Sequence, residues 1–408
     1  MAGSRYKLAE YRKPARGCNI HTVPVTASPS QLDRARVAIQ RELDDLVDSG
    51  FELGAQVAAY IGDELVIHAW AGVADPATGR LVDEKTLFPV FSVSKGIVAT
   101  AVHRLVDRGV LQYSTRLAQL WPEFGTHGKQ KITIEHVLEH SAGVPYFPPG
   151  LTADDLADEA RILSLIADCE LAWEPGTKTG YHSLTFGYLI AETIRRATGR
   201  SLDEVVRTEL AEPLGIEDEM FIVPPAEQRD RLADVDTTGF VALQKRLPGG
   251  NAFQKVVGGL PADSIVPRRF IPAGRGWAMD AALPFNATMS ARAGATLYAA
   301  LANGGQLNGR TLLPPRRVAF ATQIRRRDID QIIGAPALKS LGYLHADPVS
   351  GGVETAFGFG GLGGAEAYAD PRRRLGFAFT HNRLTPPNVE ESAPRLADLV
   401  RKNLDPTH

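Results

Sequence analysis

The sequence predicts an α+β fold, an α/β sandwich in which both ends of the chain contribute strands to one antiparallel sheet. Two strand-like segments, 55–61 and 65–73, follow an N-terminal helix and are separated by a Gly-Asp turn. Three more strand-like segments lie near the C-terminus, and helical segments occupy most of the sequence between the two groups. Strands from both ends with helices between them favour a single sheet with a helical insert packed beside it.

The first elements follow from apolar spacing and turn residues. A tail over 1–28 is expected to precede an amphipathic helix that ends near Gly50. Its apolar stripe consists of Leu32, Val37, Ile39, Leu43 and Leu46. The dipeptide Gly62-Asp63 favours a hairpin turn between the two strands that follow. A second, more apolar helix is expected over 92–109.

The middle of the chain, from 110 to about 280, predicts mostly short helices and loops. The expected helical segments are 133–140, 153–167, 183–198 and 202–210. The stretch 247–284 is rich in Gly and Pro and has little periodicity, so we interpret it as a loop over a site.

The C-terminal part predicts a helix over 288–305 that stops at a Gly-Gly pair. The expected elements after it are strands at 357–359, 365–370 and 375–381 and a closing helix at 388–403. The turn Asp370-Pro-Arg-Arg-Arg makes the last two strands a hairpin. With 408 residues the chain is long enough for two lobes. We expect an α/β lobe formed by 29–110 and 285–408, and a mostly helical lobe with active-site loops formed by 111–284.

Composition excludes several classes of protein. The net charge of −2 gives no reason to expect nucleic acid or a membrane surface as a partner. Two cysteines, Cys18 and Cys169, are too few for a disulfide framework or a zinc site. The first thirty residues are basic and polar, and no segment approaches the ~20 apolar residues that cross a bilayer. We therefore expect a cytoplasmic protein without a metal or another cofactor.

The first chemical motif is Ser92-Val93-Ser94-Lys95, at the start of an apolar helix. Residues three apart share a helical face, so the Lys95 amine can reach the Ser92 hydroxyl. A partly desolvated lysine can take the proton of a serine and make it a nucleophile. The S-x-x-K pattern marks the nucleophile of serine β-lactamases and penicillin-binding proteins. The same pattern at Ser4 and Lys7 lies in the polar tail, where we expect no function.

Two further segments are candidates for the same chemistry. Tyr181 lies in a loop just before the helix expected at 183–198, and an ammonium such as Lys95 would favour its phenolate. It would then serve as a base toward Ser92 or as an acid toward a leaving group; the alternative is a ring that only packs on the insert. The glycine-rich segment 357–364 precedes a hairpin and would offer bare backbone N–H groups to an oxyanion. Its alternative is a flexible glycine turn.

A competing motif is His136-Val-Leu-Glu-His140, which spells the H-x-x-E-H pattern of some zinc proteases. Two histidines four residues apart can share a metal, with Glu139 as the base. However, no third ligand is apparent, so we expect no metal at this position.

Together these motifs resemble the serine β-lactamase-related hydrolases: class C β-lactamases, D-amino-peptidases and family VIII-type esterases. The resemblance covers roughly 30–405 and includes Ile132-Thr-Ile-Glu-His-Val-Leu-Glu-His-Ser-Ala-Gly-Val144, the Pro-Gly…Tyr segment at 175–183, and Leu297-Tyr-Ala-Ala-Leu-Ala-Asn-Gly-Gly. It implies a β-lactamase/DD-peptidase-like fold.

The resemblance also implies a role for each site residue. Ser92 would be the acylated nucleophile, Lys95 its proton acceptor and Tyr181 the second general acid/base. The oxyanion hole would consist of the backbone N–H groups of Ser92 and Leu362.

Two departures from the family pattern narrow the range of expected substrates. Penicillin-recognising members have Tyr-x-Asn where this chain has Tyr181-His182-Ser183. They have Lys-Thr-Gly or His-x-Gly where this chain has Phe359-Gly360-Gly361, so the cation that binds a β-lactam carboxylate is missing. A neutral ester, thioester or amide fits the apolar Phe359 better. The residues expected to bind substrate are Tyr146, Ser183, Trp277, Phe359, Gly360 and Gly361.

The sequence therefore predicts an esterase-like serine acyl hydrolase that acts on a small-molecule acyl substrate through an acyl-enzyme at Ser92. The nearest alternative is an acyltransferase of secondary metabolism, with an amine or alcohol as acceptor. For that alternative, the loop aromatics Tyr146, Phe147, Trp277 and Phe285 would exclude water and bind the acceptor; otherwise they pack the loops onto the body. A weak β-lactamase, a D-amino-peptidase and a non-catalytic binding module are the remaining alternatives.

Overall fold

The computed structural model describes residues 29–147, 155, 158–236, 287–384 and 392–404. The expected tail over 1–28 and the Gly- and Pro-rich stretch 247–284 lie outside the described residues. The same is true of Trp277 and Phe285, so their expected contribution to substrate or acceptor binding remains a prediction.

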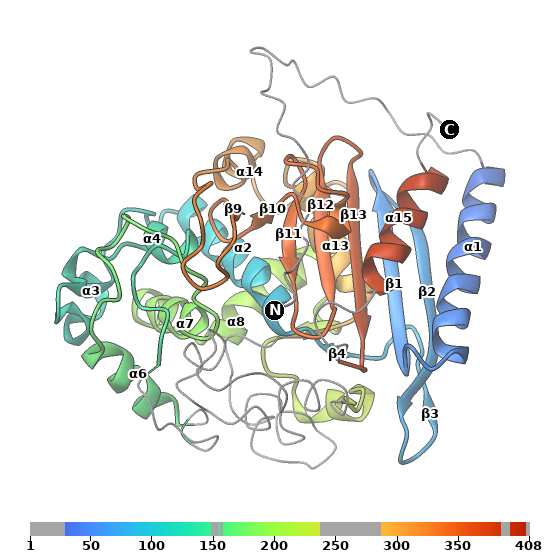
Figure 1. The fold of residues 1–408 in the computed structure, drawn as a ribbon, viewed down its shortest axis with the longest axis horizontal. Helices are drawn as coiled ribbons and strands as arrows, with labels where there is room; N and C mark the ends of the chain where they lie inside the picture. Colours follow the sequence, from blue (N-terminus) through green and yellow to red (C-terminus); the bar gives the residue numbers. More distant parts are fainter. Residues whose placement is uncertain (1–28, 148–154, 156–157, 237–286, 385–391, 405–408) are drawn as a thin grey trace, which may run out of the picture.

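A large antiparallel sheet forms the centre of the described structure (Figure 1). Its eight strands follow the order β3-β2-β1-β13-β12-β11-β10-β9, and every neighbouring pair is antiparallel. The strands are β1 (Gly54–Ile61), β2 (Glu64–Asp75), β3 (Arg80–Leu81), β9 (Leu338–Lys339), β10 (Leu344–His345), β11 (Phe357–Gly360), β12 (Glu366–Asp370) and β13 (Leu375–His381).

Strands from the N-terminal and C-terminal parts of the chain pair inside this sheet. β1 pairs with β13 from Ala55 opposite His381 to Ile61 opposite Leu375. The predicted hairpins β1–β2 and β12–β13 are both confirmed. Gly62 in the first turn has a φ of +59°, a conformation that glycine adopts without steric cost. The prediction that both ends of the chain build one sheet is therefore confirmed.

Helices cover both faces of the sheet. On one face, α1 (Pro29–Asp48) and α15 (Ser392–Leu404) pack against alternate residues of β1 and β13. On the other face lies α13 (Ala291–Ala302), which is buried along most of its length. A side chain at Gly376 of β13 would come within 2.3 Å of the Ala299 nitrogen, so glycine allows the helix backbone to approach the sheet. The sheet is therefore the middle one of three layers.

The remaining helices gather around α2 (Ser94–Asp107), whose buried face runs through the interior. They are α3 (Leu117–Leu120), α4 (Ile134–Leu138), α6 (Glu159–Asp168), α7 (Thr185–Thr198), α8 (Leu202–Val206), α9 (Glu212–Leu214) and α14 (Pro315–Ala321). The helix predicted over 202–210 becomes a π-helical turn at Arg207–Ala211. That turn precedes Pro213, which has no N–H to donate to the carbonyl of Glu209.

Two small sheets contain the remaining described strands. One has the order β4-β6-β5 and joins β4 (Phe88–Pro89), β6 (Thr288–Met289) and β5 (Met220–Phe221); the other is the hairpin of β7 (Gln306–Leu307) and β8 (Arg310–Thr311). The first sheet matters for function because β4 leads directly into Ser92.

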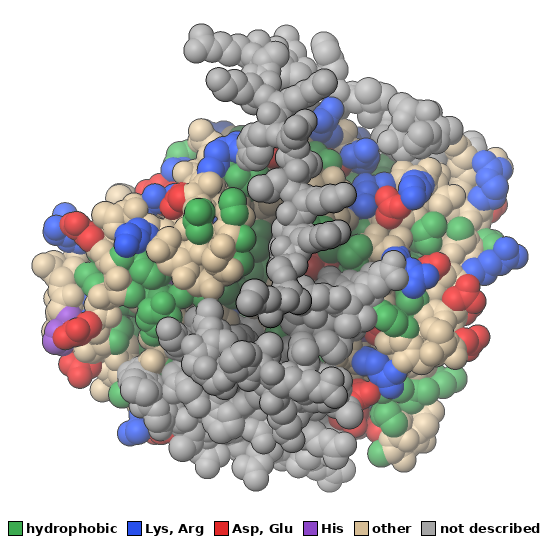
Figure 2. Space-filling view, viewed as in Figure 1, with side chains coloured by type: hydrophobic (Ala, Val, Ile, Leu, Met, Phe, Trp, Pro, Cys, Tyr) green, Lys and Arg blue, Asp and Glu red, His purple; other side chains and the backbone are tan. Residues whose placement is uncertain are grey.

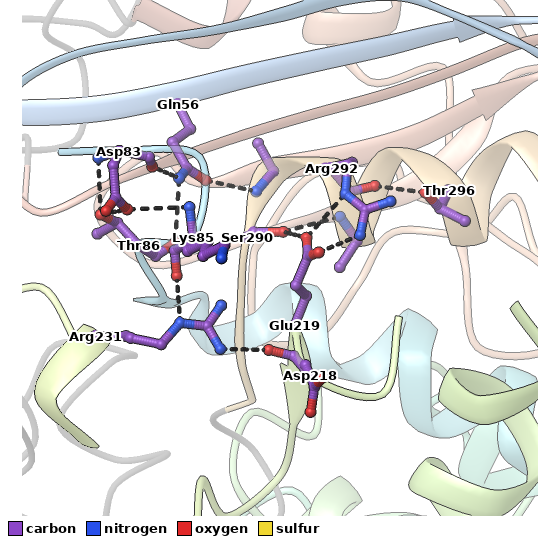
Figure 3. A network of polar contacts seen from close by, with 12 residues as sticks. Gln56, Asp83, Lys85, Thr86, Asp218, Glu219, Arg231, Ser290, Arg292 and Thr296 are labelled. Carbon is purple, nitrogen blue, oxygen red and sulfur yellow. Dashed lines mark hydrogen bonds and ion pairs between the residues drawn. The ribbon is translucent and has the colours of Figure 1, made fainter. Parts of the chain in front are cut away.

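A polar network attaches this β4 region to the central sheet and to α13 (Figure 3). The amide nitrogen of Gln56, on β1, donates to the carbonyls of Asp83 (2.6 Å) and Thr86 (3.1 Å). Its amide oxygen accepts from the backbone N–H of Ala291 at the start of α13 (2.9 Å). Nearby, Glu219 accepts from the Ser290 hydroxyl at 2.5 Å. Gln56 thus connects three segments through one buried side chain.

Gln56→Leu is expected to lower the free energy of unfolding by about 1–3 kcal/mol, because a leucine of similar size leaves buried backbone groups without partners. Urea unfolding followed by circular dichroism measures the change. Gln40→Leu is the matched control, since Gln40 lies on α1 and its partners Asp44 and the Trp70 carbonyl are at or near the surface; a change of about 0.5 kcal/mol or less is expected there. Equal effects of the two substitutions would contradict the role given to Gln56.

The described surface carries basic and acidic side chains intermingled over the face shown in Figure 2. Among the described helices, none combines the length and the apolar character that a bilayer-spanning segment requires.

Candidate active site

Ser92 lies in a tight turn between β4 and α2, within a 3₁₀ turn at Phe91–Val93. The residue before it, Phe91, has a φ of +47°, a left-handed conformation that is costly for a residue with a bulky side chain. Ser94 stabilises this turn, because its hydroxyl donates to the Phe91 carbonyl and accepts from the Ala287 N–H at 2.6 Å. The strained turn leaves Ser92 only partly buried between two buried neighbours.

The structure brings the Ser92 hydroxyl into contact with both of its predicted partners. The Lys95 Nζ lies 3.0 Å from the Ser92 Oγ, one helical turn along the same face. The Tyr181 hydroxyl reaches the same Oγ at 2.6 Å from the loop that precedes α7. A serine oxygen with an amine on one side and a phenol on the other has both a proton acceptor and a proton donor within reach.

Burial determines the charge of Lys95. The side chain is 1% exposed, and this burial lowers its pKa to about 7. Its Nζ lies 4.9 Å from the centre of the Tyr181 ring and 5.8 Å from that of Phe359. At neutral pH a substantial fraction of this lysine is therefore a neutral amine that can accept a proton.

The same burial acts in the opposite direction on Tyr181. Desolvation raises the pKa of its phenol well above the ordinary value, and the hydrogen bonds with Ser92 and Ser183 lower it by less. The expectation that Lys95 favours the phenolate is therefore wrong: the buried lysine is itself close to neutral, and a phenolate would be poorly solvated here. Tyr181 is protonated at neutral pH, which suits a hydrogen-bond donor and a general acid.

His140 and His182 fix the loop that carries Tyr181. The backbone carbonyl of His140 accepts from the Gly180 N–H at 3.0 Å, and the ring Nδ1 of His140 accepts from the His182 N–H at 3.1 Å. The His182 ring lies between the Gly180 carbonyl and the Val144 N–H, so its Nδ1 donates and its Nε2 accepts. Burial lowers the pKa of His182 to about 3. Both histidines act here as neutral parts of the scaffold.

The residues of the zinc-like motif have separate structural partners. His136 and Thr133 form a capping box at the start of α4. Glu139 forms an ion pair with Arg326 at 3.0 Å, and His140 binds the Tyr181 loop. Among the described residues, no group of three His, Cys, Asp or Glu side chains is arranged to hold a metal ion.

The glycine-rich segment lies against the serine turn. Gly361 follows β11, and a side chain there would come within 2.4 Å of the Val90 carbonyl oxygen, two residues before Ser92. Gly361 also donates to the Ala365 carbonyl at 2.7 Å. Glycine is therefore required for this close approach, which brings the loop containing Leu362 next to the serine turn. At Gly360 a side chain would meet the Glu366 carboxylate at 2.4 Å.

The residues expected to bind substrate have different environments. Phe359 is buried on β11, and its ring stacks on that of Tyr181 at 6.1 Å. Ser183 is half-buried beside Tyr181, and Tyr146 is 36% exposed. Phe147 is buried and its ring centre lies 6.0 Å from that of Tyr188, which agrees with the alternative that this aromatic packs its loop onto the body.

One neighbour of the site has no signal in the sequence. The buried carboxylate of Asp330 accepts the backbone N–H of Tyr181 at 3.1 Å. The two residues lie far apart in the chain, and no motif connects them, so only the folded structure reveals the contact.

A twisted antiparallel sheet between helical layers, with a serine in contact with a lysine and a tyrosine, is the arrangement of a serine hydrolase. Residues 39–402 match the family model described as beta-lactamase. The chain is 34% identical over 352 residues to the Esterase/beta-lactamase LipL of Mycobacterium tuberculosis, an alignment that covers 82% of this chain and 78% of LipL.

Solved structures show the same relationship. The crystal structure of a family VIII carboxylesterase is 28% identical, with a TM-score of 0.79 over 92% of this chain and 98% of that one. A penicillin-binding protein homologue from Caulobacter crescentus is 29% identical, with a TM-score of 0.78 over 93% and 99% of the two chains. The chain belongs to the beta-lactamase family and is an enzyme of its serine hydrolase class. The predicted fold class and family are confirmed.

Proposed function

We propose that this enzyme is an esterase-type acyl hydrolase that forms a covalent acyl-enzyme at Ser92. The observation that carries the proposal is the position of the Ser92 Oγ, 3.0 Å from a buried amine and 2.6 Å from a protonated phenol. The printed descriptions of LipL as an esterase/beta-lactamase and of a similar structure as a carboxylesterase support the same reaction class.

In the proposed mechanism, the neutral amine of Lys95 takes the proton of Ser92 as its oxygen attacks the substrate carbonyl. The oxyanion is held by the backbone N–H groups of Ser92 and Leu362. Tyr181 donates its proton to the leaving alcohol, thiol or amine as the bond to the acyl carbon breaks, and it regains a proton from the Lys95 ammonium. Water then attacks the acyl-enzyme, and the proton transfers run in reverse. Tyr181 passes its proton to Lys95 and takes a proton from the attacking water, and the Lys95 ammonium returns a proton to Ser92 as the acid is released.

The described surroundings of Ser92 favour a neutral acyl substrate. By the family resemblance, Phe359 takes the position of the Lys or His in the Lys-Thr-Gly or His-x-Gly motif of penicillin-recognising members. Its ring stacks on Tyr181 beside the serine. A carboxylated β-lactam would lose its ionic partner at this position. We therefore expect small esters, thioesters or amides to be the better substrates, with β-lactam turnover weak.

Fluorophosphonate labelling tests the covalent step. A single mass increase that maps by peptide analysis to Ser92 is expected, and an unlabelled protein or a label on another serine would contradict the proposal.

Analysis of the products of a small ester, with and without an added amine or alcohol, identifies the group that accepts the acyl chain. Free acid is expected in both reactions, whereas a predominantly acylated acceptor would establish the acyltransferase alternative.

A further inference from the structure

A buried ion pair lies directly behind the Tyr181 loop. The Asp330 and Lys339 side chains are 0% and 1% exposed, and the Lys339 Nζ is 2.5 Å from the Asp330 Oδ2. Lys339 belongs to β9, the strand at one edge of the central sheet. Removal of two charges from water is costly, and a hydrophobic pair of similar volume is often no less stable. The pair is therefore weak evidence for a contribution to the stability of the fold.

The second oxygen of the carboxylate binds backbone rather than another side chain. The Asp330 Oδ1 accepts the N–H groups of Ile332 (2.8 Å), Ile333 (2.9 Å) and Tyr181 (3.1 Å). The first two bonds fold the Asp330 segment around its own carboxylate. The third bond connects that segment to the residue whose hydroxyl contacts Ser92.

The Tyr181 loop is consequently held by two different segments. Gly180 and His182 donate their N–H groups to His140, at the end of α4. Tyr181, between them, donates to Asp330, and the Gln331 N–H donates to the Thr179 carbonyl at 2.8 Å. A side chain at Gly180 would come within 2.5 Å of the Trp173 ring, so the loop also has little room to shift.

We propose that Asp330 is a positioning residue that sets the place of the Tyr181 hydroxyl, and that Lys339 holds its carboxylate charged and in a fixed orientation. The inference rests on the proposed role of Tyr181 as the proton donor. Although burial opposes ionisation, Lys339 and the backbone donors keep the pKa of Asp330 below its ordinary value. A carboxylate with both oxygens engaged allows little movement of the peptide bound to it. Displacement of a reacting group by about 1 Å can cost 10²-fold in rate.

Two charge-neutral double variants separate the hydrogen-bond acceptor from the charge. Asp330→Asn with Lys339→Met retains a carbonyl oxygen for the Tyr181 N–H, whereas Asp330→Leu with Lys339→Met removes it. Both are measured for kcat and KM on a small p-nitrophenyl ester, in the wild-type background and with Tyr181→Phe. The Asn/Met variant is expected to keep kcat within a few-fold of wild type. The Leu/Met variant is expected to lose about 10- to 100-fold in kcat at nearly constant KM.

The Tyr181→Phe background distinguishes positioning from a general structural effect. Without the phenol hydroxyl, the Leu/Met change is expected to cause no further loss of kcat, because the group that it misplaces is gone. An equal loss in both backgrounds, or no loss in either, would overturn the inference. If Tyr181→Phe alone retains full kcat, the proposed function of Tyr181 fails, and that result is distinct from the other two.

Glu209→Gln is the matched control. Glu209 is also buried, at 2% exposure, and pairs with Arg108 at 2.7 Å, away from the site. It is expected to lower thermal stability and leave kcat unchanged in both backgrounds. Should the Leu/Met variant not fold, hydrogen exchange of the wild-type protein decides: a slowly exchanging Tyr181 amide supports the inference, and rapid exchange of that amide overturns it.

Discussion

Ser92→Ala is expected to reduce kcat on small p-nitrophenyl esters by about 10⁴- to 10⁶-fold, as removal of the nucleophile does in other serine hydrolases. The loss is large because Lys95 and Tyr181 both act through the Ser92 oxygen, which lies 3.0 Å and 2.6 Å from them. Without that oxygen, neither group can form or resolve an acyl-enzyme. The residual rate reflects only binding and the remaining hydrogen-bond donors.

The chain contains its own control for this experiment. Ser4 and Lys7 repeat the spacing of Ser92 and Lys95 in the polar N-terminal segment, so Ser4→Ala is expected to retain full activity. Circular dichroism should show that purified Ser92→Ala is folded, so that its loss of activity cannot be attributed to unfolding. Full esterase activity in Ser92→Ala would refute the nucleophile assignment.

Replacement of Lys95 has the second largest expected effect on catalysis, and the pH dependence of kcat/KM tests whether Lys95 is the base. Because only the neutral amine accepts the serine proton, kcat/KM should rise with pH and reach half of its maximum near the lysine pKa of about 7. No decline from Tyr181 is expected until well above pH 10, since burial raises the pKa of its phenol. Lys95→Arg, whose guanidinium stays charged, should lose about 10³-fold or more in kcat/KM at every pH. A wild-type profile that is flat between pH 5 and 9 would contradict Lys95 as the base.

Lys95 should also lower the free energy of unfolding at pH values at which its buried amine is charged. Its pKa falls from 10.5 in the unfolded chain to about 7 in the folded protein, so the unfolded state binds more protons between these values. The free energy of unfolding therefore rises with pH across this window. Lys95→Met should be more stable than wild type at pH 7 or below, and this advantage should disappear above about pH 10.5. Thermal unfolding across that range, compared with the wild type, measures the effect.

Local patterns in the sequence predict the longer elements and single out the three side chains that the structure brings into contact, Ser92, Lys95 and Tyr181. The strand-like segments and their Gly-Asp and Asp-Pro turns predict the β1–β2 and β12–β13 hairpins, which are confirmed. The two-residue strands β9 and β10 could not be predicted, because two residues show no periodicity. Asp330 and Lys339 likewise escaped prediction, since their relation to Tyr181 exists only after folding.

The incorrect expectation about Tyr181 has a different origin. Considered as a pair, an ammonium beside a phenol favours the phenolate. In the folded protein both groups leave water together, and desolvation opposes charge on each of them. A sequence shows which groups are neighbours in a motif, but the amount of water removed from them depends on the whole fold.

The pairing of β1 with β13 also has a consequence for biosynthesis. Ile61, at the end of β1, pairs with Leu375, so more than 300 residues are translated between β1 and its partner strand. At ordinary ribosomal rates, the first hairpin must wait roughly 20 to 60 s for the strand that completes the sheet. During that time its open edge is free to pair with other nascent chains. Expression at a lower temperature or with a chaperone should therefore raise the soluble yield, and removal of the last hairpin should yield aggregated protein rather than a smaller folded domain.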